Sequence, residues 1–235
     1  MINNLSFAIK PNEIVAIVGE SGSGKSISSL ALMGLLPKKI SKITSGTILF
    51  NDKNLVEVTQ KQFQNIRGKD IAMIFQEPMS ALNPSMRCGK QVEDVLKQHS
   101  NLSASEIKSE VLSLFEKVKL PNPKKLYKTY PHEISGGQKQ RVMIAMAIAC
   151  KPKLLIADEP TTALDVTVQK EILELLKTLQ NETKMSILFI SHDLALVSAL
   201  ADNVLVMYKG EIVEQADTHS IFKTPIHNYT KALIG

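Results

Sequence analysis

Near the N-terminus, eight consecutive residues have the types and spacing of a phosphate-binding loop. They fit the pattern G-x-x-x-x-G-K-[ST] at every fixed position and read Gly19, Glu20, Ser21, Gly22, Ser23, Gly24, Lys25 and Ser26. Glycines let a backbone wrap around a phosphate so that successive amides point inward. Lys25 would reach the outer phosphates, and the Ser26 hydroxyl would bind Mg²⁺. The segment predicts a site for a nucleotide and magnesium; the alternative is a glycine-rich turn with a chance Lys-Ser pair.

A second group of reactive side chains, Asp158 and Glu159, follows the apolar run at residues 154–157. An apolar strand that ends in two acids delivers them at the carboxyl edge of a sheet, where open α/β sheets bind ligands. Asp158 would supply a hard oxygen to the magnesium shell. Glu159 would polarise the water that attacks the γ-phosphorus in line. Two acids at a strand end predict little alone, but together with the loop they indicate nucleotide hydrolysis.

The elements that must position these groups follow from the pattern of the chain. The β-branched run at residues 13–18 predicts a buried strand directly before the loop, and a helical pattern then continues through Leu36 to Pro37. Further strands are predicted at residues 46–50, 70–75, 154–157, 187–190, 203–208 and 211–214, the last two as a hairpin. Helices are predicted at residues 103–118, 168–179 and 193–200. Strands that alternate with helices indicate a mostly parallel, helix-covered sheet.

The composition is that of a globular domain and excludes several classes of protein. At 235 residues, with 44% hydrophobic and 22% charged, the chain can bury a full core without disulfides or a structural metal. Its longest apolar run, residues 142–150, is far shorter than the roughly 18 residues of a membrane helix, and no signal peptide is expected. Cys88 and Cys150 are expected to be reduced thiols. The net charge of +5 is spread along the chain, which predicts a solvated surface.

A third segment resembles part of a known family. Residues 130–141 read Tyr-Pro-His-Glu-Ile-Ser-Gly-Gly-Gln-Lys-Gln-Arg and resemble the signature segment of ATP-binding-cassette (ABC) ATPases. A serine and two glycines at a helix start would form a second anion site, here Ser135, Gly136, Gly137 and Gln138. In that family the site caps the γ-phosphate held by the opposite subunit. The resemblance therefore implies that one chain supplies half of each catalytic site.

Three further segments occur in the order that this family requires. The first, residues 75–78, resembles the glutamine loop of the family. The second, residues 162–165, resembles the dimer-interface loop, and the third, residues 191–193, resembles the histidine switch. The resemblance implies that Gln76 touches Mg²⁺ and the attacking water, and that Asp165 lies at the dimer interface. It also implies that His192 contacts the γ-phosphate and orients Glu159 and the water. The implied enzyme is an ATPase that uses ATP and Mg²⁺.

The resemblance can be narrowed to the importer branch that serves dipeptides, oligopeptides and nickel. Residues 71–84, 141–147 and 157–167 are similar to the first of the two ATPase subunits that such systems encode. The implied function is dimer closure by MgATP and hydrolysis, coupled to uptake of peptides, nickel or metal chelates. The implied partners are a second cassette subunit, two membrane permeases and, indirectly, an extracytoplasmic binding protein, with no nucleic acid. The resemblance favours a heterodimer over a homodimer. It also implies that this chain lies at the cytoplasmic face of the membrane, held there peripherally by the permease subunits.

The fold class implied by the resemblance is α/β: a P-loop NTPase (RecA-like) core with a small antiparallel β part and an inserted α-helical signature subdomain. Residues 1–77 and 150–235 would form the nucleotide-binding core, and residues 78–149 the helical subdomain. One alternative is a non-transport cassette for DNA repair or ribosome work, which typically has two cassettes or a long coiled-coil insertion. Another is a P-loop GTPase or kinase, but no Asn-Lys-x-Asp guanine reader occurs, and a kinase would not need residues 135–138.

One family feature has no counterpart in this sequence. In the family, a leading strand with an aromatic residue that stacks on adenine precedes the strand at residues 13–18. Met1 already lies in the next segment, so we expect this chain to begin inside the usual cassette. Phe7 is expected to be a core residue that alternates with Leu5 and Ile9, and no residue is assigned to adenine stacking.

Overall fold

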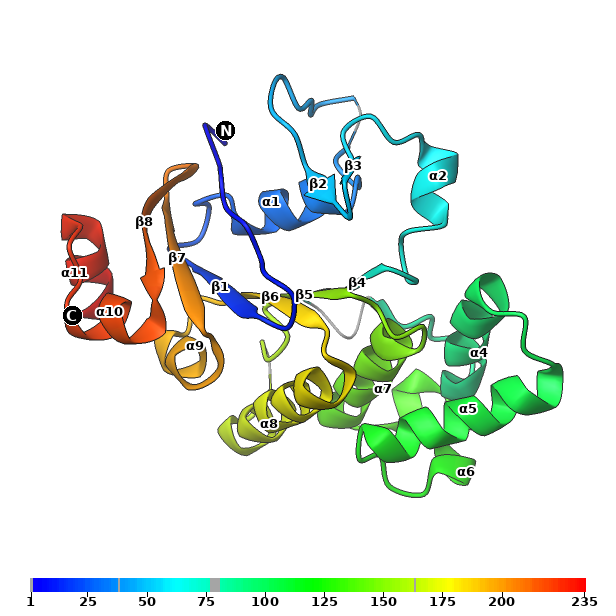
Figure 1. Ribbon diagram of the computed structural model, residues 1–235. Helices are drawn as coiled ribbons and strands as arrows, with labels where there is room; N and C mark the ends of the chain where they lie inside the picture. The colour runs from blue at the N-terminus through cyan, green and yellow to red at the C-terminus, as the bar shows by residue number, and fades with distance from the viewer. Residues whose placement is uncertain (1, 38, 77–80, 163) are drawn as a thin grey trace. The chain divides into compact units, whose positions relative to one another are not determined.

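The computed structural model describes residues 2–37, 39–76, 81–162 and 164–235 (Figure 1). They form two compact units. The first consists of Met1–Lys10, Ile14–Arg67 and Leu188–Gly235, and the second of Pro11–Glu13 and Gly68–Ile187. The second unit ends at Ile187 and the first resumes at Leu188, so strand β6 (Ser186–Ile190) has residues in both units.

The first unit contains most of the strands. Its other elements are β1 (Ile14–Val18), α1 (Lys25–Leu32), β2 (Leu49–Phe50), β3 (Lys53–Asn54), α2 (Gln60–Gln64), α9 (Leu194–Leu200), β7 (Asn203–Tyr208), β8 (Glu211–Asp217), α10 (Thr218–Lys223) and α11 (Asn228–Ile234). The strand order is β6-β1-β7-β8, with β1 parallel to β7 and β7 antiparallel to β8. Strands β2 and β3 form a separate antiparallel pair. The predicted hairpin is confirmed, and its turn has Lys209 and Gly210 at φ 47° and 88°, as a type I′ turn requires.

The second unit is mainly helical. Its elements are β4 (Ile71–Ile74), α4 (Cys88–His99), α5 (Ala104–Lys117), α6 (Pro123–Leu126), a short 3₁₀ helix (Pro131–Glu133), α7 (Gly136–Ile148), β5 (Leu154–Asp158) and α8 (Val166–Thr183). The strand order is β4-β5-β6, and β4 is parallel to β5. All five residues of β1 and of β6 are buried. Continuous apolar strands of this kind are typical of parallel sheets covered on both faces, so the predicted α/β fold is confirmed.

Helix α1 is shorter than the sequence pattern predicts. It ends at Leu32, not at Leu36, because Gly34 adopts φ 59° in the left-handed region. The Gly34 amide donates to the carbonyl of Ala31 and the Leu35 amide to that of Leu30, at 3.0 and 2.8 Å. These two bonds form a Schellman motif, which satisfies the last carbonyls of a helix and reverses the chain. The prediction of a helix up to Pro37 was therefore wrong.

The N-terminal segment also differs from its prediction. Leu5, Phe7 and Ile9 alternate with exposed residues, as expected, but they are half-buried and not core residues. No strand is assigned within residues 2–10. The Asn3 amide donates to the carbonyl of Gly210 at 2.9 Å, so a backbone hydrogen bond ties this segment to the hairpin turn. In the described ranges, no helix is both long and apolar enough to cross a membrane.

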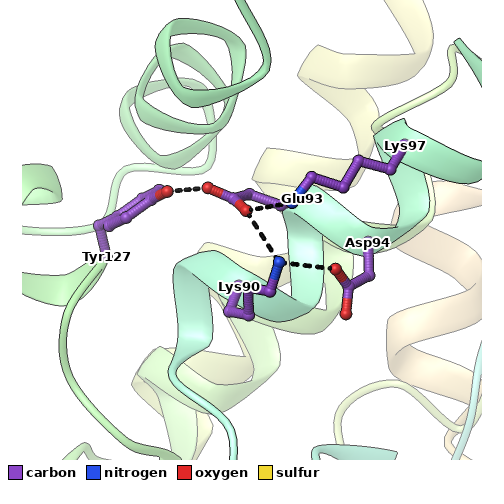
Figure 2. A network of polar contacts seen from close by, with 5 residues as sticks. All are labelled: Lys90, Glu93, Asp94, Lys97 and Tyr127. Carbon is purple, nitrogen blue, oxygen red and sulfur yellow. Dashed lines mark hydrogen bonds and ion pairs between the residues drawn. The ribbon is translucent and has the colours of Figure 1, made fainter. Parts of the chain in front are cut away.

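A polar network fixes helix α4 in the second unit (Figure 2). The Glu93 carboxylate accepts a hydrogen bond from the hydroxyl of Tyr127, which caps the end of α6, and forms ion pairs with Lys97 at 2.8 Å and Lys90 at 3.3 Å. Lys90 also pairs with the exposed Asp94 at 3.2 Å. Partial burial alone would raise the pKa of Glu93, but the two ammonium groups outweigh it and hold the pKa below the ordinary value.

Glu93→Gln should lower the free energy of unfolding by about 1–2 kcal/mol at pH 7, because a charged acceptor with three partners is lost. The folded pKa of Glu93 lies below its unfolded value, so the carboxylate stabilises the fold above about pH 4.3, and this is lost as pH falls through the folded pKa. Denaturant unfolding at pH 7 and pH 3 measures both effects. Asp94→Asn, which removes an exposed pair, should cost at most about 0.5 kcal/mol. An equal loss for Glu93→Gln at both pH values would contradict this prediction.

Candidate functional site

The predicted phosphate loop connects β1 to α1 in the first unit. Gly19, Gly22 and Gly24 have φ values of +149°, +82° and +111°, which side chains other than glycine rarely adopt. Gly24 directly precedes Lys25, the first residue of α1, so the loop runs into the helix N-terminus. The positive end of the helix dipole makes this a place for an anion.

Two side chains of the loop fit a phosphate. Lys25 is buried, with 6% of its surface exposed, and its Nζ donates to the carbonyls of Gly19 and Glu20 at 2.7 and 3.0 Å. The Ser23 hydroxyl is also buried and has no hydrogen-bond partner within the described part of the chain. A buried hydroxyl without a partner is rare in native proteins and is explained where a ligand completes it.

His192 lies in the turn between β6 and α9 of the first unit. The Ser191 hydroxyl accepts the amide hydrogen of Asp193 at 3.0 Å. Asp193 in turn caps α9 by accepting the amides of Ala195 and Leu196. His192 therefore lies between two residues joined by a hydrogen bond, and the predicted helix start at residue 193 is confirmed.

The two acids lie at the end of β5 in the second unit. Asp158 is its last residue and only 4% exposed. Glu159 follows at φ 46°, a left-handed conformation that costs free energy for a side chain with a Cβ. Its Oε2 accepts hydrogen bonds from Gln76 Nε2 at 2.8 Å and from the Thr162 hydroxyl at 3.0 Å. The structure thus brings Gln76 and Glu159 together.

The signature segment begins helix α7, as the sequence predicts. The Ser135 hydroxyl accepts the Gln138 amide at 3.3 Å, and the Gln138 side chain accepts the Ser135 amide at 3.1 Å, which is a capping box. Ser135 and Gly136 are exposed, so this helix start faces solvent. A Cβ added to Gly137 would lie 2.9 Å from Val168 Cγ1, so glycine lets α7 approach α8 closely.

Asp165, the predicted interface residue, caps helix α8. Its Oδ1 accepts the amide of Val168 at 2.9 Å, and its own side chain is exposed. The adjoining Val166 is 67% exposed. A Cβ on Gly136 would lie 3.6 Å from Leu164 Cδ2, so the interface loop lies against the signature segment.

The predicted site residues are divided between the units. The phosphate loop and His192 belong to the first unit, and Gln76, Asp158, Glu159, the signature segment and Asp165 to the second. Ser26 and Asp158, two of the predicted magnesium ligands, are therefore not in the same unit. The positions of Glu77, Pro78 and Ala163 in the predicted loops lie outside the described residues.

Sequence reasoning missed two residues that contact this machinery. One is Thr162, whose hydroxyl holds Glu159. Its only signal was its place three residues after that glutamate, in the segment read as the interface loop. The other is Tyr229, whose hydroxyl accepts the amide of Glu20 from 209 residues away, a contact that no local pattern indicates.

A glycine loop between a buried strand and a helix, with acids at the end of a parallel strand, defines a P-loop nucleotide-binding protein of the α/β class. The family described as ABC transporter matches residues 2–162. The chain belongs to the ABC transporter family. Members of this family bind ATP, in general with Mg²⁺.

Its similarity to individual proteins extends over the whole chain. It is 52% identical to the oligopeptide transport ATP-binding protein OppD of Bacillus subtilis (strain 168), with 100% of this chain and 65% of that protein covered. It is 49% identical to the dipeptide transport ATP-binding protein DppD of the same strain, with 100% and 70% covered. The dimeric structure of a post-hydrolysis state of the ATP-binding cassette MJ0796, bound to ADP and Pi, superposes with a TM-score of 0.80 at 27% identity, over 92% of this chain and 90% of the other. The chain thus spans about two thirds of the length of these two curated relatives.

Proposed function

We propose that this chain is the ATP-hydrolysing subunit of an ABC importer, which couples MgATP-driven dimer closure and hydrolysis to uptake through partner permeases. The observation that carries the proposal is the position of Glu159. Its carboxylate follows the buried Asp158 and is held by Gln76 and Thr162. A carboxylate fixed by two donors at a strand end is placed to act as a general base towards water.

The residues that bind the nucleotide are those of the phosphate loop. Gly19 to Ser26 would surround the phosphates with backbone amides, and Lys25 would exchange its bonds to the loop carbonyls for the outer phosphates. The buried Ser23 hydroxyl would gain an acceptor. Ser135, Gly136, Gly137 and Gln138 would cap the ATP of the partner cassette, since their helix start is exposed.

The donor set fits magnesium. Ser26, Gln76 and Asp158 offer hydroxyl, amide and carboxylate oxygens, which are the hard ligands that Mg²⁺ takes along with phosphates and water. The side-chain Nε2 of Gln76 donates to Glu159, and the side-chain Oε1 of Gln76 would bind the cation. When bound, Mg²⁺ neutralises charge that develops on the phosphate oxygens.

The chemical step then depends on five side chains. Glu159 accepts a proton from the attacking water, and Gln76 and Thr162 hold its carboxylate in one orientation. His192 would contact the γ-phosphate from its rigid turn and orient the water. Lys25 would stabilise the negative charge that develops on the outer phosphates during hydrolysis.

The proposed partners are a second ABC subunit, two membrane permeases and, through them, an extracytoplasmic binding protein. Exposed Asp165 and Val166 would face the second cassette, which we propose to be a related chain, with a homodimer as the other possibility. The names of the relatives support peptides as cargo and favour transport over DNA repair or ribosome work. Nickel or metal chelates are the second class of cargo that we propose. The chain would then lie peripherally at the cytoplasmic face of the membrane.

The proposal also includes a division of the chain. Residues 1–77 and 150–235 would form the nucleotide-binding core, and residues 78–149 the helical subdomain. It is supported by the run of helices from α4 to α7, which has no assigned strand between its described residues.

Lys25→Ala should weaken MgATP binding by about 10- to 100-fold, because a charge-assisted contact to phosphate is worth roughly 1.5–3 kcal/mol. Isothermal titration of the purified chain with MgATP measures the Kd. The matched control is Lys170→Ala, which removes an exposed lysine of α8. Wild-type affinity in Lys25→Ala, or no ATP binding by the unaltered chain, would reject the proposed function. The proposed assembly with permeases is tested by coexpression with candidate permeases, where copurification of the chain is the expected result.

A further inference from the structure

Helix α11 reaches the phosphate loop through one side chain. Tyr229 lies in this helix, and its hydroxyl accepts the amide hydrogen of Glu20 at 3.1 Å. Glu20 is the second residue of the loop, directly after Gly19. The tyrosine, the loop and the strands beside them all belong to the first unit. A residue near the C-terminal end of the sequence thus contacts the backbone of the nucleotide-binding loop.

The Tyr229 ring is itself held in place. It packs on the ring of Tyr208, with centroids 4.2 Å apart and planes tilted by 32°. The Tyr229 amide donates to Nδ1 of His227, and the His227 amide donates to the carboxylate of Glu214, at 3.1 and 2.9 Å. Aromatic packing and these caps leave the hydroxyl little freedom, so it is a fixed acceptor.

Glu20, whose amide donates to Tyr229, also forms a hydrogen bond at its carbonyl. Lys25 Nζ donates to the Glu20 carbonyl at 3.0 Å, while Tyr229 takes the Glu20 amide. Further along the loop, the Ser23 carbonyl accepts the amide of Gly210, in the turn that follows Tyr208, at 2.9 Å. Tyr229 and the hairpin turn therefore hold the loop at two points.

We propose that Tyr229 is a positioning residue for the phosphate loop. Its hydroxyl directs the Glu20 amide outward and so sets the orientation of the peptides that follow it, before any nucleotide binds. A preformed loop loses less conformational freedom on binding than a mobile one, which raises affinity. The proposal rests on the proposed function, since it assumes that the loop binds ATP. Tyr229 acts through the loop and touches no reacting atom.

The test compares two hydroxyl deletions in the purified full chain. Tyr229→Phe keeps the ring on Tyr208 and removes only the acceptor of the Glu20 amide. Tyr208→Phe, the matched control, removes the other hydroxyl of the pair, which faces Lys209. In Tyr229→Phe, amide hydrogen exchange of the loop peptide should quicken without nucleotide, and the Kd for MgATP should rise by about 3- to 10-fold. In the assembled ATPase, KM should rise with kcat within about twofold.

Faster loop exchange and weaker binding in Tyr229→Phe, with neither change in Tyr208→Phe, would support the proposal. Unchanged exchange and Kd in Tyr229→Phe would overturn it. Equal effects in both variants would also overturn it, because ring packing and not the hydroxyl would then be responsible. If the unaltered chain bound no ATP, the proposed function would fail, whereas the exchange comparison would still decide whether Tyr229 orders the loop.

Discussion

Glu159→Gln should lower ATP turnover by about 10²- to 10⁴-fold while MgATP still binds, since this is the range that a general base contributes. Glutamine has nearly the same shape, but it cannot take a proton from water. The phosphate loop belongs to a different stretch of the chain and is unaltered, so the Kd for MgATP should change little. Single-turnover hydrolysis and equilibrium binding, measured on the same preparation, separate the two effects.

The controls for Glu159→Gln use two other side chains of the second unit. Glu174→Gln alters an exposed carboxylate of α8 and should leave turnover unchanged. Thr162→Val removes one of the two donors to the Glu159 carboxylate and should lower turnover by about 3- to 10-fold, the cost of one hydrogen bond. Full turnover in Glu159→Gln would exclude Glu159 as the base. Full turnover in Thr162→Val would show that the Thr162 hydroxyl is not needed to orient the carboxylate.

Local sequence signals predicted the elements that depend on near neighbours. The helix starts at Ser103 and Ser135 were predicted from residues close together in the sequence, and the structure has a capping box at each. The strand before the phosphate loop and the turn at residues 209–210 were likewise readable from short patterns. Such features form wherever the same few residues occur together, so little of the rest of the fold is needed to place them.

Contacts between distant parts of the chain could not be predicted in the same way. The bond from Glu20 to Tyr229 spans 209 residues, and Gln76 reaches Glu159 across 83. The second pair was expected only from a family resemblance, and the first was not expected at all. The early end of α1 had a local signal, Gly34, which a stricter reading of helix C-caps would have used. The half-burial of Leu5, Phe7 and Ile9 had no such signal, because alternation indicates a face but not what covers it.

Gly19→Ala should lower the free energy of unfolding by about 3–5 kcal/mol, through two effects that add. A Cβ at this position would lie 2.1 Å from the carbonyl oxygen of Met207 and 3.1 Å from Ser23 Oγ. The first of these neighbours is backbone of strand β7 and cannot move without disturbing the sheet, which makes the overpacking expensive. In addition, φ +149° is unfavourable for alanine. Denaturant unfolding of the two proteins measures the loss.

Gly22→Ala is the matched comparison for Gly19→Ala, because it differs in only one of the two effects. Its φ of +82° is also unfavourable for alanine, but nothing lies within 4 Å of the added Cβ. The expected loss of stability is therefore about 1–2 kcal/mol, from backbone strain alone. The open space beside Gly22 is where a loop that surrounds a phosphate needs room, so this variant should still fold and yet bind MgATP more weakly. Equal destabilisation by the two substitutions would show that the contact between the loop and Met207 is not what requires glycine at position 19.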